Sequence, residues 1–142
     1  MRRKNVVTFG LVFLIVLGLG FYFLFPMKLG EYLDKADMIY ISIHQPILED
    51  GQADIQLQKY ELEKNTAEYA EFLNLIQKKS YRRVWSSVIQ STLENGDVYI
   101  LVNTENADLI ISDTGEILID GHKYVLWDKT DNLSQKIIDL LE

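Results

Sequence analysis

Hydrophobic residues are concentrated at the start of the chain. Val6 to Phe25 is a run of twenty residues without a charged side chain, with Thr8 as its one strongly polar member. A helix of this length rises about 30 Å, which matches the hydrocarbon core of a bilayer. The pattern predicts a transmembrane helix over residues 6–25.

After this run, hydrophobic positions alternate with polar ones. Met38 to His44 places isoleucines on one side and other residue types on the opposite side, which is the period of a half-buried strand. Asp54 to Gln58 repeats the pattern, and the intervening segment contains Pro46 and Gly51. We therefore expect two paired strands joined by a turn over residues 45–52.

Two segments have the period of an amphipathic helix. Asn65, followed three residues later by Glu68, has the form of a capping box. The hydrophobic stripe that follows it at helical spacing is Tyr69, Phe72, Leu73 and Ile76. Near the end of the chain, Thr130 or Asp131 is expected to open a second helix. The hydrophobic face of that helix is Leu133, Ile137, Leu140 and Leu141.

The segment between these two helices has the pattern of an antiparallel meander. Asn-Gly and Asp-Gly pairs readily adopt the positive φ angles of tight hairpins, and short runs of strand-forming residues lie between them. The expected strands are Val84 to Thr92, Val98 to Val102, Leu109 to Ile111, Ile117 to Ile119 and Tyr124 to Trp127. The expected turns are Asn95-Gly96, Asp113-Thr114-Gly115 and Asp120-Gly121.

These elements predict an α+β protein in which a mainly antiparallel meander sheet carries two helices packed on one face. The expected divisions are a basic N-terminus (1–5), the transmembrane helix (6–25), a short juxtamembrane linker (26–36) and one α+β domain (37–142). The last division is long enough for one small domain with a single core.

Charged and aromatic residues flank the apolar run in the order of a signal anchor. Short segments rich in Lys and Arg stay in the cytoplasm during membrane insertion. We therefore expect a single-pass protein of the cell membrane, with a cytoplasmic N-terminus and an extracytoplasmic C-terminal domain. The residues expected at the two membrane interfaces are Arg2, Arg3, Lys4, Phe21, Tyr22 and Phe23.

A cleaved signal peptide is the alternative for the N-terminus, because it also has a basic start and an apolar middle. Gly18 and Gly20 provide small residues for cleavage, but a cut there leaves the sequence Phe-Tyr-Phe-Leu-Phe at the new terminus in water. We therefore expect the helix to be retained. The chain has no cysteine, which excludes a lipidated cysteine anchor and a disulfide framework.

Charge divides unevenly along the chain. Residues from Lys28 onward contain eleven of the fourteen Lys and Arg residues and all 21 Asp and Glu residues, which gives this part a formal net charge of −10. An acidic domain is repelled by nucleic acids. We expect no nucleic-acid partner, and the lipid bilayer is the expected partner of the apolar helix.

Candidate catalytic residues lie mainly in predicted turns. Asp113-Thr114-Gly115 matches the aspartic-protease triplet, but Ser112 and Glu116 depart from the residues that usually flank it. A hairpin turn requires the same residue types. His44 and His122 are the two histidines, and neither lies in a metal-binding motif. We therefore expect neither a metal nor another cofactor.

One short segment combines residue types that are enriched at interaction hot spots. Tyr81, Arg82, Arg83 and Trp85 bring two aromatic rings and two cations together in an acidic domain. These four residues are a candidate interaction patch. The alternative is that the aromatic residues belong to the core and that the arginines pair with nearby acids.

The order of the predicted elements resembles small membrane-anchored or exported proteins of Gram-positive bacteria, which form a family of unknown function. The likeness covers about residues 37–127, behind the N-terminal anchor. It rests on the strands Ile39 to Ile43 and Asp54 to Leu57, the helix opening near Asn65, and the aromatic segment Tyr81 to Trp85. The resemblance implies a cell-surface location and supplies no catalytic residue.

Two functions fit these features. The first is a non-catalytic binding or interaction module at the cell envelope, with another envelope or membrane protein as its partner. The second is a small surface hydrolase that uses Asp113, Asp120 or His122. Because no catalytic motif occurs in a supporting sequence context, we favour the first.

Overall fold

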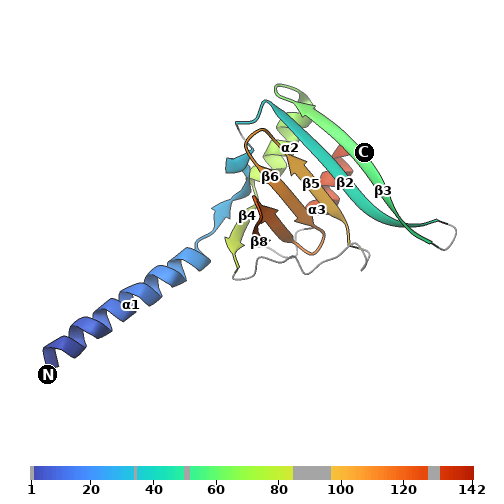
Figure 1. Cartoon of the computed structure of the whole chain (residues 1–142). Helices are drawn as coiled ribbons and strands as arrows, with labels where there is room; N and C mark the ends of the chain where they lie inside the picture. The colour runs from blue at the N-terminus through green and yellow to red at the C-terminus, as the bar shows by residue number, and fades with distance from the viewer. Residues whose placement is uncertain (1, 34, 50–51, 85–96, 128–131) are drawn as a thin grey trace.

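The fold combines an antiparallel sheet, two helices on one face of that sheet and a long N-terminal helix that projects from the domain (Figure 1). The computed structural model describes residues 2–33, 35–49, 52–84, 97–127 and 132–142. Within these ranges the sheet has eight strands, and every neighbouring pair is antiparallel. The predicted α+β class is confirmed.

Helix α1 (Arg2–Leu24) contains the apolar run. Its segment Val7–Leu24 has a mean hydropathy of 2.5, and no part of it is buried by the rest of the molecule. The helix is therefore long and apolar enough to cross a membrane, as the sequence pattern predicts.

The segment that we expected to be a linker over residues 26–36 belongs to the folded domain. Strand β1 (Met27–Lys28) joins one edge of the sheet, and the 3-10 helix η1 (Leu29–Tyr32) follows it directly. Leu29 and Leu33 have exposed fractions of 0%. The expectation fails because a flexible linker would leave these hydrophobic side chains in water, whereas the core accepts them.

The sheet has the strand order β1-β4-β8-β7-β6-β5-β2-β3. The remaining strands are β2 (Met38–Glu49), β3 (Gln52–Glu63), β4 (Ser80–Arg83), β5 (Tyr99–Asn103), β6 (Asp108–Ser112), β7 (Glu116–Ile119) and β8 (His122–Leu126). Strands β5 to β8 form the predicted meander. Beyond Val84, the strand predicted over residues 84–92 lies outside the described residues, as does the predicted Asn95-Gly96 turn.

Two predicted turns of the meander are confirmed. Asp120 and Gly121 both have positive φ angles, 48° and 78°, and join β7 to β8. Gly115 has a φ of 78°, and its N–H donates a hydrogen bond to the carbonyl of Ser112 at 3.1 Å. Local turn chemistry therefore sets the register of these hairpins.

The β2–β3 hairpin is longer than predicted, because β2 continues to Glu49 and β3 begins at Gln52, both inside the range expected to be a turn. Each strand has 12 residues, and they pair from Met38 with Glu63 to Glu49 with Gln52. Pro46 is tolerated because β5 pairs with β2 only over residues 40–44, so one edge of β2 is free of strands at Pro46.

Helices α2 (Ala67–Gln77) and α3 (Leu133–Leu141) cover one face of the sheet and are seen behind it in Figure 1. We call this the helix face and the opposite one the open face. The core lies between the helices and the sheet. Its largest fully buried side chains include Phe72, Ile76, Ile41, Ile43, Ile100, Ile111 and Ile117.

Both helices begin slightly later than predicted. Thr66, rather than Asn65, caps α2, because its Oγ1 accepts a hydrogen bond from the N–H of Tyr69 at 3.3 Å. Asn65 instead adopts a φ of 73° in the preceding turn. Helix α3 is capped by Asn132, and the predicted openings at residues 130–131 lie outside the described residues.

Candidate functional site

The two carboxylates of the hydrolase hypothesis lie at opposite ends of β7. The Oδ2 of Asp113 accepts a hydrogen bond from the N–H of Val98 at 3.2 Å, and the Oδ1 of Asp120 accepts one from the N–H of Asp108 at 3.1 Å. Strand β7 has 4 residues, and each residue of a strand adds about 3.3 Å. The two carboxylates are too far apart to share a proton, and each ties its turn to the backbone of another segment.

The Asp-Thr-Gly turn is organised by Ser112, which is buried. Its Oγ lies 2.7 Å from the Oγ1 of Thr114 and accepts a hydrogen bond from the N–H of Glu116 at 3.1 Å. These contacts bring the ends of β6 and β7 together. The protease-like triplet is therefore explained by the requirements of a hairpin.

The structure also separates the two histidines. His44 pairs with Tyr99 in β5, whereas His122 pairs with Ile119 beside the β7–β8 turn. In the part of the chain that the structure describes, no three His, Asp or Glu side chains form a group that could hold a metal ion.

The candidate interaction patch is not one surface in the described part of the chain. Tyr81 has an exposed fraction of 1%, and its ring packs edge-on against Tyr124 with the ring centroids 5.0 Å apart. Because successive residues of a strand point to opposite faces, Arg82 lies on the other side of the sheet from Tyr81 and Arg83. Tyr81 is thus a core residue and not a surface contact. Trp85 lies outside the described residues.

Arg83 makes a contact that sequence reasoning missed. Its Nη1 donates a hydrogen bond to the carbonyl of Tyr22 at 3.3 Å, and its Cζ lies 4.1 Å from the centroid of the Tyr22 ring. The last carbonyls of a helix have no partner within the helix, so this guanidinium satisfies one of them and also makes a cation–π contact. The contact ties the end of α1 to β4. Sequence patterns give no signal for it, because 61 residues separate the two partners.

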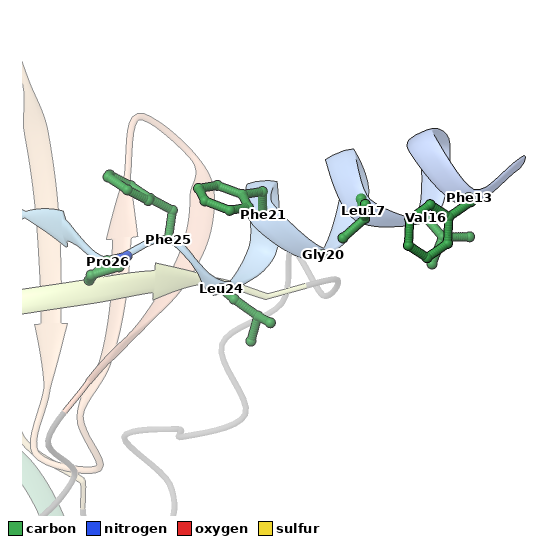
Figure 2. A pocket seen from close by; sticks show the side chains of 8 residues that line it. All are labelled: Phe13, Val16, Leu17, Gly20, Phe21, Leu24, Phe25 and Pro26. Atoms are coloured by element: carbon green, nitrogen blue, oxygen red, sulfur yellow. The ribbon is translucent and has the colours of Figure 1, made fainter. Parts of the chain in front are cut away.

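The surface of α1 has an open hollow with apolar walls, shown in Figure 2. Its volume is about 360 Å³, and Gly20 contributes a position without a side chain. The residues around it are Phe13, Val16, Leu17, Gly20, Phe21, Leu24, Phe25 and Pro26. Such walls suit a lipid acyl chain, because they offer no hydrogen-bonding side chain to a polar ligand.

The residues predicted at the outer membrane interface lie at the end of α1. Phe21 and Tyr22 are exposed, and the ring of Phe21 stacks on that of Phe25 with the centroids 6.1 Å apart. Phe23 meets Tyr22 edge-on at 5.3 Å. The side chains of residues 2–4, the predicted inner interface, lie outside the described part of the structure.

The geometry defines a small α+β domain joined to an exposed helix that is long enough to cross a membrane. Comparisons of the chain with protein-family models, with curated proteins and with solved structures give no match. The resemblance to exported Gram-positive proteins therefore stays a prediction.

Proposed function

We propose that this is a single-pass membrane protein with a cytoplasmic N-terminus and an extracytoplasmic domain, and that the domain is a non-catalytic binding module for another protein of the cell envelope. The observation that carries the proposal is the exposed apolar helix α1, which only Phe25 and Pro26 separate from β1. Three basic residues at the start of α1 precede its apolar run, which favours this orientation.

The contact between Arg83 and Tyr22 supports a helix that is retained. Cleavage after Gly20 would remove most of α1 and leave Tyr22 without its helix. Cleavage would also expose the remaining aromatic residues to water. An anchor that is kept avoids both effects.

A binding role is favoured over hydrolysis because the carboxylates considered for catalysis already make structural hydrogen bonds from the turns. Asp113 and Asp120 each accept a hydrogen bond from a backbone N–H, of Val98 just before β5 and of Asp108 in β6. The geometry brings neither of them to a second carboxylate of the hydrolase hypothesis. Substituting Asn for both residues should therefore leave the biological activity unchanged once folding is verified.

Cysteine labelling tests the orientation, because the chain has no cysteine of its own. We expect an impermeant maleimide to label Glu105→Cys, which is an exposed site between β5 and β6, on intact cells. Asn5→Cys should react only after the cells are permeabilised. Labelling in the reverse pattern, or a mature mass that lacks α1, would contradict the proposal.

Crosslinking in cells tests the binding role. The full-length protein should capture a specific envelope or membrane protein, and residues 1–26 fused to an unrelated domain should not. Loss of capture by an Arg82→Ala, Trp85→Ala variant would assign the contact to these two residues of the predicted patch. If the parent and the fusion capture the same proteins, the domain is not a binding module.

A further inference from the structure

The hydrophobic side of the β2–β3 hairpin changes from one face to the other along its length. In the half that belongs to the main sheet, the side chains on the helix face are hydrophobic except for Gln58: Ile39, Ile41, Ile43, Tyr60 and Leu62. Their neighbours on the open face include Ser42, Lys59 and Glu61. This half follows the ordinary rule that the covered face is the hydrophobic one.

The pattern is reversed in the distal half, which we define as residues 45–49 and 52–57. On the helix face, Gln45, Asp54 and Gln56 are polar, and Ile47 is the exception. On the open face, Leu48, Ile55 and Leu57 have exposed fractions of 81%, 46% and 47%, and Pro46 lies among them. The distal half therefore presents its hydrophobic side where the described chain does not cover it.

This distal half is a ribbon of two strands. Strand β5 pairs with β2 only over residues 40–44, and β3 is the last strand of the sheet. Figure 1 shows the hairpin extending past β5, on the side of the domain away from α1. A two-stranded ribbon is marginally stable in water, and a third strand stabilises it.

The backbone makes the two edges of the ribbon unequal. The N–H of Lys64 donates to the carbonyl of Asp37, and antiparallel alternation from this pair directs the N–H and C=O groups of Ile55 and Leu57 away from β2. The same alternation directs the nitrogen of Pro46 away from β3. Because proline has no N–H, the β2 edge lacks a donor there, while the β3 edge keeps its donors.

Asp54 marks the free edge of β3. Its Oδ1 accepts a hydrogen bond from the N–H of Ile55 at 2.7 Å. A carboxylate oxygen thus takes the position that a carbonyl of a neighbouring strand takes inside a sheet. In the described residues, no strand pairs with β3 on this edge.

Charge selects among the molecules that could pair with this edge. Strand β3 carries Asp54, Glu61 and Glu63 against one cation, Lys59, and the chain from Lys28 onward has a net charge of −10. A second copy or an anionic bilayer would be repelled, whereas a basic segment would be attracted. The ribbon also extends away from α1, which makes the bilayer a poor occupant (Figure 1).

We infer that the distal half of β3 is a strand-addition site for an extended segment of another protein in which hydrophobic and basic residues alternate. The added backbone pairs with the outward groups of Leu57 and with those of Ile55, where its carbonyl replaces the Asp54 carboxylate as the acceptor for the Ile55 N–H. Its hydrophobic side chains lie beside Ile55 and Leu57 on the open face, and its basic side chains lie beside Asp54 on the other face. This inference rests on the proposed binding function and names the site and the class of partner.

Peptide binding to the full-length chain in nanodiscs of zwitterionic lipid tests the site. We expect a short peptide of alternating Val and Lys to bind, as measured by fluorescence anisotropy. A Val and Glu peptide should bind at least about tenfold more weakly, which corresponds to about 1.4 kcal/mol. The Val and Lys peptide with methylated backbone nitrogens should also lose binding, because it cannot pair with an edge. Equal binding of all three peptides would overturn the inference without any protein variant.

Two matched substitutions locate the binding surface. Leu57→Lys adds a positive charge at the proposed edge and should weaken binding of the Val and Lys peptide about tenfold. Tyr40→Lys adds the same charge on the open face of β2, at a residue of similar exposure, and should change the affinity less than twofold. Equal affinities in two folded variants would contradict the site. Dimerisation of the parent that Leu57→Lys abolishes would replace the partner segment with a second copy.

Crosslinking in cells separates this inference from the proposed function. If Leu57→Lys captures the same envelope partner as the parent, the proposed function stands and the β3 site is wrong. If the parent captures no partner through its domain, the proposed function itself fails. Loss of the partner in Leu57→Lys, with retention in Tyr40→Lys, supports both.

Discussion

At the scale of single residues, Lys123 and Glu116 form an ion pair that is almost fully buried. The Nζ of Lys123 lies 2.6 Å from the Oε1 of Glu116, and the two side chains have exposed fractions of 5% and 13%. They come from neighbouring strands, on the open face of the sheet. Burial makes each charge dependent on the other, because neither is well solvated by water.

We predict that Glu116→Gln lowers the free energy of unfolding by about 3 kcal/mol, because it removes a carboxylate that pairs with the buried Lys123 ammonium. Adding Lys123→Met to that variant should recover part of the loss, because the buried ammonium is then removed. Urea denaturation of the parent, both single variants and the double variant measures the coupling. Strictly additive losses would show that the two charges do not depend on each other.

The pair between Lys64 and Asp37 is different, because it is exposed. The Nζ of Lys64 lies 2.6 Å from the Oδ1 of Asp37, and this hydrogen bond raises the pKa of Lys64 above its ordinary value of 10.5. A raised pKa in the folded state means that the contribution to stability is complete below pH 10.5. It is lost as the pH rises through the raised value. Solvent and salt keep this contribution small.

At the scale of elements, local patterns predict the meander well because its information is local. Alternating residues and Asp-Gly chemistry define β6 to β8 and their turns without reference to the rest of the chain. The predicted first strand ends before Pro46, whereas β2 continues past this residue. Whether proline interrupts a strand depends on which neighbour its nitrogen faces, and that is a property of the assembled sheet.

Local sequence patterns cannot predict the position of η1 or the contact of Arg83, because both depend on parts of the chain that are distant in sequence. Leu29 and Leu33 are two residues in a short segment, too few to define a helical or strand period, and η1 packs against α2, which comes much later in the chain. Arg83 belongs to the predicted interaction patch and Tyr22 to the predicted membrane interface. Nothing in the spacing of distant residues indicates that they meet.

The packing of η1 against α2 depends on Gly30. A Cβ at this position would lie 2.9 Å from the Cα of Gln77, which is closer than packed side chains allow. We predict that Gly30→Ala lowers the free energy of unfolding by about 1–3 kcal/mol, because the helix backbone must shift. Glu31→Ala, at the exposed neighbouring residue, is the control and should be nearly neutral. Equal unfolding midpoints would show that η1 does not pack closely on α2.

At the scale of the whole molecule, the join between α1 and the domain fixes how close the domain lies to a membrane. Helix α1 ends at Leu24 and β1 begins at Met27, so the connection is too short to act as a tether. Arg83 also holds Tyr22 at the end of the helix. When α1 spans a bilayer, the β1–β4 end of the sheet therefore lies at the surface of that bilayer.

The same join predicts which part of the chain folds without the helix. A fragment that begins at Pro26 keeps β1 and η1, whereas one that begins at Asp37 loses Leu29, Leu33 and Ala36, each with an exposed fraction of 1% or less. Each buried Leu contributes about 2 kcal/mol, and small domains have about 5–15 kcal/mol in total. We therefore expect cooperative urea unfolding only for the longer fragment. If both fragments unfold at the same midpoint, residues 26–36 are a linker after all, and the domain is free to move away from the membrane.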